Sequence, residues 1–233
     1  AGITTFDCAD IYTGVEALIG RFLRERDAGA AVQVHTKYVP DLSSLGALRA
    51  ADVGAAVERS RQRLGVDRLD LVQFHWWDLA VPGIVDVLRW LDGERRRGAV
   101  RHLGLTNVDT PTMATILAAG VPVLTHQVQY SVLDQRPAGA MHDLCRRHDV
   151  RFLCYGTLAG GFLDERFLDA PDPATITNRS RIKYRLVIDE CGGWARFQDL
   201  LHVLAGVARK HGVRLGALAV AWVLEQPLVA AAI

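Results

Sequence analysis

The sequence predicts an α/β fold built on a parallel sheet. Short apolar runs alternate with amphipathic helical runs along the whole chain, which is the pattern of repeated strand–helix units. The strand-like runs are almost continuously apolar, as in a sheet covered on both faces. Polar side chains close several of these runs, at the strand ends where parallel α/β folds carry their functional groups.

Local patterns justify each element. Residues 15–26 place Leu18, Ile19, Phe22 and Leu23 in one stripe, which is typical of an amphipathic helix. Pro82 near the start of the third helix suits a first turn, which needs no backbone donor. The expected strands are residues 3–6, 31–36, 69–74, 100–105, 121–128, 150–155 and 228–233. The expected helices are residues 15–26, 50–64, 82–97, a short one after Thr110-Pro111, 138–148, 194–211 and 215–225.

Polar groups at many strand ends favour a TIM-type (β/α)8 barrel, whose site is assembled from several strand ends. The alternative is an open doubly wound sheet, but that fold binds its ligand at one crevice and the chain lacks a GxGxxG turn. We expect a single domain over residues 1–233 with a long loop at residues 156–193. This loop is either a solvated insertion or a flap over a bound phosphate. Its basic residues are Arg179, Arg181, Lys183 and Arg185.

Composition excludes several classes of function. The chain has 233 residues, half of them apolar, and a formal net charge of +1, so no nucleic-acid or anionic membrane surface is expected. Its four cysteines form no CxxC pair, which predicts no metal site and reduced thiols in the cytoplasm. No apolar run reaches the roughly 20 residues of a membrane helix, and no secretory signal is visible.

The polar strand ends suit acid–base chemistry on a carbonyl. Asp7 closes the first strand and Tyr12 follows it by five residues, while Lys37 and His75 close the second and third strands. A cation near a tyrosine lowers the phenol pKa, and a carboxylate keeps a partly buried lysine charged. Tyr12 would then be the general acid and His75 would orient the carbonyl oxygen. No side chain can supply a hydride, so a cofactor must bring it.

Asp, Tyr, Lys and His in this order resemble the catalytic tetrad of the aldo-keto reductases. Other family-like segments are residues 35–37, 61–64, 98–107, 127–131 and 155–161. The resemblance implies a barrel that lacks its first strand and its C-terminal cofactor-binding tail. It also implies NADP(H) as the cofactor, with NAD(H) as the alternative. The cofactor-binding residues that it implies are Asp7, Thr106, Asn107, Gln127, Tyr155, Gly156, Thr157 and Leu158.

By position in the family, Thr106, Asn107 and Gln127 would hold the nicotinamide carboxamide, and Tyr155 would stack on the ring. Thr106 replaces the usual serine and keeps the hydroxyl. Trp76 and Trp77 follow His75, and they would form either an apolar wall for the substrate or loop packing.

The function expected from this resemblance is reduction of an aldehyde or ketone to an alcohol by NADPH, with a small molecule as the partner. Two alternatives are a non-catalytic cofactor-binding subunit that regulates a partner and a truncated pseudo-enzyme of the same fold.

Overall fold

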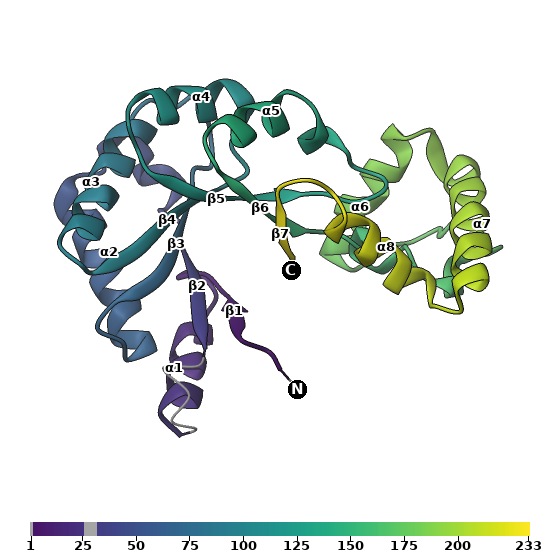
Figure 1. Ribbon diagram of the computed structural model, residues 1–233, viewed down its shortest axis with the longest axis horizontal. Helices are drawn as coiled ribbons and strands as arrows, with labels where there is room; N and C mark the ends of the chain where they lie inside the picture. The colour runs from purple at the N-terminus through teal and green to yellow at the C-terminus, as the bar shows by residue number, and fades with distance from the viewer. Residues whose placement is uncertain (1, 26–31) are drawn as a thin grey trace. The chain divides into compact units, whose positions relative to one another are not determined.

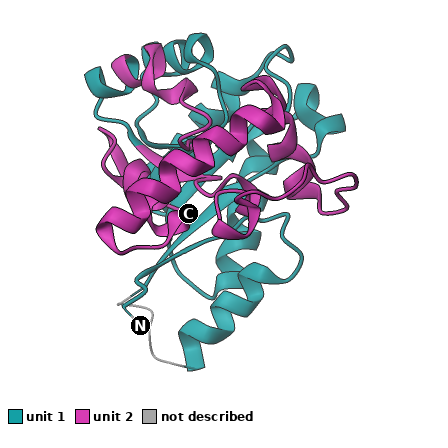
Figure 2. Ribbon diagram, turned by 90° about the vertical axis from the view of Figure 1, so that its right-hand side faces the viewer, with its two compact units in different colours: residues 1–127, 144–151 teal, residues 128–143, 152–233 magenta. Residues whose placement is uncertain are grey.

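The computed structural model describes residues 2–25 and 32–233. The chain divides into two compact units (Figure 2). The first comprises residues 1–127 and 144–151, and the second comprises residues 128–143 and 152–233. All four predicted catalytic residues belong to the first unit.

The part of the chain that the structure describes contains seven strands, which follow one another in the sheet in chain order. They are β1 (Thr5–Asp7), β2 (Gln33–Tyr38), β3 (Leu69–His75), β4 (Val100–Thr106), β5 (Val123–Gln129), β6 (Arg151–Tyr155) and β7 (Val229–Ala232). Pairing is parallel from β1 through β5 and between β6 and β7. In a (β/α)8 barrel, parallel strands follow one another in chain order and helices separate them. Seven of the eight strands of such a barrel are present in the described residues. The predicted fold class is confirmed.

Eight α-helices separate or follow these strands in the described residues. They are α1 (Val15–Glu25), α2 (Ala50–Leu64), α3 (Ile84–Arg96), α4 (Thr110–Ala118), α5 (Ala140–Arg147), α6 (Arg179–Glu190), α7 (Gly193–His211) and α8 (Leu215–Leu224). In the first unit α1, α2 and α3 pack in succession beside the strands (Figure 1). Gly20 permits the close approach of α1 to α2, because a Cβ there would lie 2.5 Å from the carbonyl oxygen of Arg63.

The boundaries of three predicted elements can be compared with the structure. The third helix begins at Ile84 rather than at Pro82, because Gly83 has a left-handed conformation with φ of 115° that precedes the first turn. The predicted end of the first helix at Arg26 and the start of the second strand at Ala31 lie outside the described residues. The short helix after Thr110-Pro111 is present, and the Asp109 side chain caps it by accepting a bond from the Thr112 backbone N–H at 2.9 Å.

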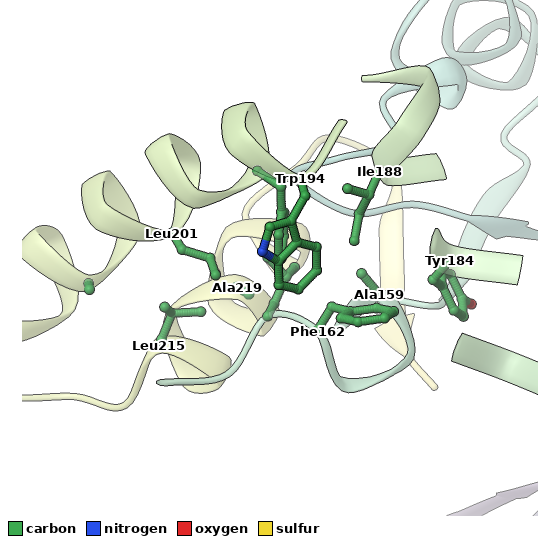
Figure 3. Packing of buried hydrophobic residues seen from close by; sticks show 11 residues of the cluster. Ala159, Phe162, Tyr184, Ile188, Trp194, Leu201, Leu215 and Ala219 are labelled. Atoms are coloured by element: carbon green, nitrogen blue, oxygen red, sulfur yellow. The ribbon is translucent and has the colours of Figure 1, made fainter. Parts of the chain in front are cut away.

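The long connection of residues 156–193 is more structured than its sequence suggested. It contains α6, which the sequence analysis missed and which begins where the Asn178 side chain accepts a bond from the Arg181 backbone N–H at 3.1 Å. Tyr184 and Ile188 lie one turn apart on α6, and both are buried in a cluster with Phe162 and Trp194 (Figure 3). These two buried side chains, four positions apart, lie on one face of α6 and pack it against the cluster. Two positions are too few to give a clear periodic signal in the sequence.

Among the helices of residues 2–25 and 32–233, none is long and apolar enough to cross a membrane. Within the same residues, no group of histidine, cysteine and acidic side chains could hold a metal ion.

Candidate active site

Along β2, the side chain of the predicted catalytic residue Lys37 points to the opposite face of the strand from that of Thr36. Thr36 donates its hydroxyl to Oε1 of the buried Glu16 on α1 at 2.6 Å, whereas Lys37, the next residue, contacts Asp7 at the end of β1. Successive side chains of a strand point to opposite faces, so β2 presents one polar group to the helices and the next to the site. The parallel register pairs Asp7 with His35 and Lys37 with Gln73, which brings these strand ends together.

The carboxylate of Asp7 is the centre of the site. Its Oδ1 forms an ion pair with Lys37 Nζ, and its Oδ2 accepts hydrogen bonds of 2.8 Å from both Gln73 Nε2 and Gln127 Nε2. Lys37 Nζ also donates to the carbonyl oxygen of Cys8 at 2.9 Å. Both charged side chains are largely buried, with 7% of Lys37 and 15% of Asp7 exposed. Buried charges of this kind are tolerated when each is paired and hydrogen-bonded, as both are here.

Arg63 of α2 fixes the loop that carries Tyr12. Its guanidinium donates to the carbonyl oxygen of Asp10 at 3.0 Å and to Oε2 of Glu16 at 3.2 Å. The backbone N–H of Asp10 donates to the carbonyl oxygen of Lys37 at 3.1 Å. The Tyr12 backbone N–H closes a turn on Ala9 at 3.0 Å. Three of these hydrogen bonds therefore involve the loop between β1 and α1 and position it beside the end of β2, and the fourth links Arg63 to Glu16 of α1.

Tyr12 lies in the site, with its ring centroid 5.9 Å from Lys37 Nζ and 47% of the residue exposed. The expected lowering of its pKa by Lys37 is wrong for the protein alone. Burial raises the pKa of the Tyr12 phenol, and the negative charge of Asp7 raises it further. Tyr12 is therefore protonated at neutral pH, which is the form a general acid needs.

His75, the last residue of β3, is a neutral imidazole at neutral pH. Burial lowers its pKa, a hydrogen bond to the backbone of Thr106 opposes this, and the charge of Lys37 lowers the pKa further. The bond to Thr106 and an edge-to-face contact with Trp77, with ring centroids 4.6 Å apart, hold the ring. A neutral imidazole has a single N–H, so a substrate carbonyl would compete with Thr106 for it.

The ends of β4 and β5 carry the predicted carboxamide-binding residues. Thr106 pairs with Gln127 in the register, and both are buried. Asn107 has a left-handed conformation with φ of 56°, and its backbone N–H donates to the carbonyl oxygen of Gln127 at 3.0 Å. The next N–H, of Val108, donates to Nε2 of the fully buried His126 at 3.2 Å. Burial lowers the pKa of His126 to about 3, so this acceptor stays neutral.

These groups fit a nicotinamide carboxamide in their chemistry. A carboxamide offers two N–H donors and one carbonyl acceptor, and Thr106 and Asn107 can each donate and accept. Gln127 uses its amide nitrogen on Asp7 and on Gln73 Oε1 at 2.9 Å, so its amide oxygen remains to accept a bond from the ligand.

The other predicted cofactor residues, Tyr155, Gly156, Thr157 and Leu158, belong to the second unit. Lys183 of α6 reaches Tyr155 there: its Nζ lies 4.6 Å from the ring centroid and donates to the phenol oxygen at 3.4 Å. Gly156 has φ of 71°, and an added Cβ would clash with the Tyr184 ring. Glycine is thus required at this turn after β6. The predicted roles of all four residues toward a cofactor stay predictions.

The two tryptophans after His75 differ in how much of each side chain is exposed to solvent. Trp76 is 2% exposed, packs on Phe74 and donates its indole N–H to the carbonyl oxygen of Val81 at 3.1 Å. Trp77 is 49% exposed and lies against His75. Trp76 is therefore loop packing, and the proposed substrate wall is Trp77 alone.

Gln73 is the site residue that sequence reasoning missed. It is fully buried on β3, two residues before His75 and therefore on the same face of the strand. That spacing was the available signal, because a glutamine within an otherwise apolar strand needs polar partners. The structure supplies them as Asp7 and Gln127.

The cysteines, which all lie within the described residues, form no disulfide and do not suit nucleophilic catalysis. Burial raises the thiol pKa of Cys8 to about 11, and those of Cys145 and Cys154 to about 12. These thiols are protonated at neutral pH, and a thiolate is the reactive form. Cys191 is exposed.

Asp10 should make the stability of the protein depend on pH. Burial raises the pKa of its carboxyl from 3.8 to about 6, although the N–H of Val39 donates to Oδ1 at 3.1 Å and opposes the shift. The folded state thus binds a proton more readily than the unfolded state, so this group contributes stability below about pH 4 that is lost as the pH rises through about 6. Asp10→Asn, which retains the acceptor oxygen, should be more stable than the original protein at pH 7.5.

Urea unfolding of both proteins at about pH 4 and pH 7.5 tests this prediction. The difference in stability between them should be present at pH 7.5 and nearly absent at about pH 4. An equal difference at both pH values would contradict the assignment to Asp10.

Comparison with known proteins identifies the family. The model of the Aldo/keto reductase family matches residues 1–233, so the chain belongs to this family. The flagellar radial spoke protein 5 of Chlamydomonas reinhardtii is 32% identical over 257 residues, which cover 93% of this chain and 49% of the relative. An aldo-keto reductase of Schizosaccharomyces pombe whose name specifies NADP(+) is 26% identical, over 97% of this chain and 67% of its own length.

A solved structure supports the same fold. The glycerol dehydrogenase of Gluconobacter oxydans superposes with a TM-score of 0.81 at 26% identity, and the match covers 99% of this chain and 71% of the dehydrogenase. The chain thus spans about half of the radial spoke protein and about two thirds of the yeast reductase.

Proposed function

We propose that the protein reduces an aldehyde or ketone to an alcohol with NADPH, with Tyr12 as the general acid. The observation that carries this proposal is the ion pair of Asp7 and Lys37 at the ends of β1 and β2, with the Tyr12 ring 5.9 Å from Lys37 Nζ and His75 at the end of the neighbouring strand β3. A protonated tyrosine and a neutral histidine in one site would suit protonation of a polarised carbonyl oxygen. The name of the yeast relative favours NADP(H) over NAD(H).

Each group then has one role. NADPH, when bound, supplies the hydride that forms the new C–H bond at the carbonyl carbon. Tyr12 gives its phenolic proton to the carbonyl oxygen, which becomes the alcohol hydroxyl. Lys37 Nζ, paired with Asp7 and 5.9 Å from the Tyr12 ring centroid, is placed to offset part of the negative charge that develops on the phenol oxygen once the proton has left. Thr106, Asn107 and Gln127 hold the carboxamide.

Titration with NADPH and with NADH, followed by the quenching of tryptophan fluorescence, tests the binding part of this proposal. Saturable quenching is expected, with NADPH tighter than NADH. The consumption of NADPH with a panel of aldehydes and ketones, and of NADP+ with glycerol, then tests turnover. Absence of quenching by both cofactors would overturn the proposal.

A second candidate function is a non-catalytic subunit that binds the cofactor and docks on a larger protein. The likeness to a flagellar radial spoke protein is the specific observation in its favour. Saturable NADPH binding without turnover on any carbonyl of the panel, together with a stable complex with a larger protein, would favour this candidate over the first.

A further inference from the structure

Gln73 forms a closed triangle of hydrogen bonds with the catalytic carboxylate and the carboxamide-binding glutamine. Its Nε2 donates to Asp7 Oδ2 at 2.8 Å, and its Oε1 accepts from Gln127 Nε2 at 2.9 Å. Gln127 Nε2 closes the triangle on the same Asp7 oxygen at 2.8 Å. Gln73 is fully buried, so water does not compete for these bonds.

The triangle fixes which way both amides point. Asp7, paired with Lys37, is a carboxylate and can only accept hydrogen bonds, so an amide nitrogen must face it from each glutamine. An amide nitrogen carries two hydrogens, and Gln127 uses one on Asp7 and the other on Gln73. If the Gln127 amide were flipped, its oxygen would face two acceptors and both bonds would be lost.

The neighbouring strand leaves room for this arrangement. Gly104 of β4 lies opposite Gln73 in the register, and a Cβ at Gly104 would meet Thr125 Oγ1 at 2.4 Å and would also lie 3.2 Å from Gln73 Cγ. Such a contact is tighter than ordinary packing, so the glycine gives the Gln73 side chain its space.

We propose that Gln73 is a positioning residue that holds the Gln127 amide oxygen toward the nicotinamide carboxamide and links that pocket to the Asp7–Lys37 pair. This inference rests on the proposed cofactor site. It has a specific consequence: Gln127 accepts a hydrogen bond from the ligand and does not donate one. The site should therefore prefer a ligand with a carboxamide NH2 over one with a methyl group in that place.

The test compares NADP+ with its 3-acetylpyridine analogue, which keeps the carbonyl oxygen but has a methyl group instead of the amide NH2. Both are titrated by tryptophan fluorescence against the original protein and against Gln73→Met, which keeps the side-chain length but removes both hydrogen bonds. The original protein should prefer NADP+, and the ratio of the two dissociation constants should fall about fivefold in Gln73→Met, as expected for one neutral hydrogen bond. Gln33→Met on the exposed part of β2 is the matched control and should keep the original ratio.

The outcomes separate this inference from the proposed function. Equal weakening of both ligands in Gln73→Met, with an unchanged ratio, would mean a merely structural role and would overturn the inference alone. Equal affinity of the original protein for both ligands would also overturn it and leave the proposed function standing. Binding of neither ligand to the original protein would overturn both. If Gln73→Met does not fold, Gln73→Asn, whose shorter amide cannot span Asp7 and Gln127, provides the same comparison.

Discussion

Replacing Tyr12 by phenylalanine is expected to lower kcat for carbonyl reduction by about 10²–10⁴-fold, the usual contribution of a general acid. The change removes the phenolic proton that the carbonyl oxygen would receive. Folding should be unaffected, because Tyr12 is half exposed and phenylalanine keeps the ring beside Lys37. The dissociation constant for NADPH should stay within about a factor of two, since the residues of β4 and β5 that we propose to bind the carboxamide are untouched.

Steady-state turnover and fluorescence titration of the same preparation measure both quantities. Tyr130→Phe is a matched control, because Tyr130 is buried against Trp222 and has no proposed role in the reaction. Its kcat should be unchanged. A Tyr12→Phe protein that keeps a tenth or more of the original kcat would remove Tyr12 from the role of acid.

Replacing Lys37 by methionine should lower the free energy of unfolding by about 3–5 kcal/mol. The substitution keeps most of the side-chain volume but leaves the Asp7 carboxylate without its counter-charge, and only 15% of that side chain is exposed. The bonds from Gln73 and Gln127 to Asp7 remain, but neutral amides compensate a buried charge less well than an ammonium group. Urea unfolding provides the measurement.

Two further variants test whether the loss of stability comes from the unpaired Asp7 charge. Asp7→Asn combined with Lys37→Met removes both charges and should recover much of the lost stability, because no uncompensated charge remains. Arg89→Met breaks the exposed pair with Asp86 and should change stability by less than about 1 kcal/mol. A Lys37→Met protein as stable as Arg89→Met would show that the pair is not a buried structural element.

The sequence was sufficient for the strand order and for the polar strand ends. Asp7, Lys37 and His75 could be predicted because each closes a strand-like run, and a parallel sheet brings such ends to one edge. The Asp7–Lys37 pair was also expected, whereas the hydrogen bonds from Gln73 and Gln127 to Asp7 were not. Spacing also places Lys37 near Tyr12, but the pKa of Tyr12 rises because the phenol is partly buried and Asp7 is near, and local sequence does not report either.

Gln73 and α6 were missed for related reasons. Gln73 is one polar residue within an apolar strand, and its partners lie on β1 and β5, 66 and 54 residues away along the chain. The α6 helix has a short buried stripe of Tyr184 and Ile188 among charged neighbours, and tertiary packing supplies most of its stability. Both features depend on contacts that are distant in sequence, which local patterns do not report.

The central claim is that the site moves a hydride from NADPH to a carbonyl carbon while Tyr12 protonates the oxygen. The most direct measurement uses NADPH deuterated at the transferring carbon of the nicotinamide ring, with an aldehyde that the protein consumes, and analyses the alcohol by mass spectrometry. The account predicts one deuterium on the carbinol carbon of each product molecule, and a rate that falls in Tyr12→Phe. Alcohol without deuterium, or no alcohol from any carbonyl despite saturable NADPH binding, would contradict it.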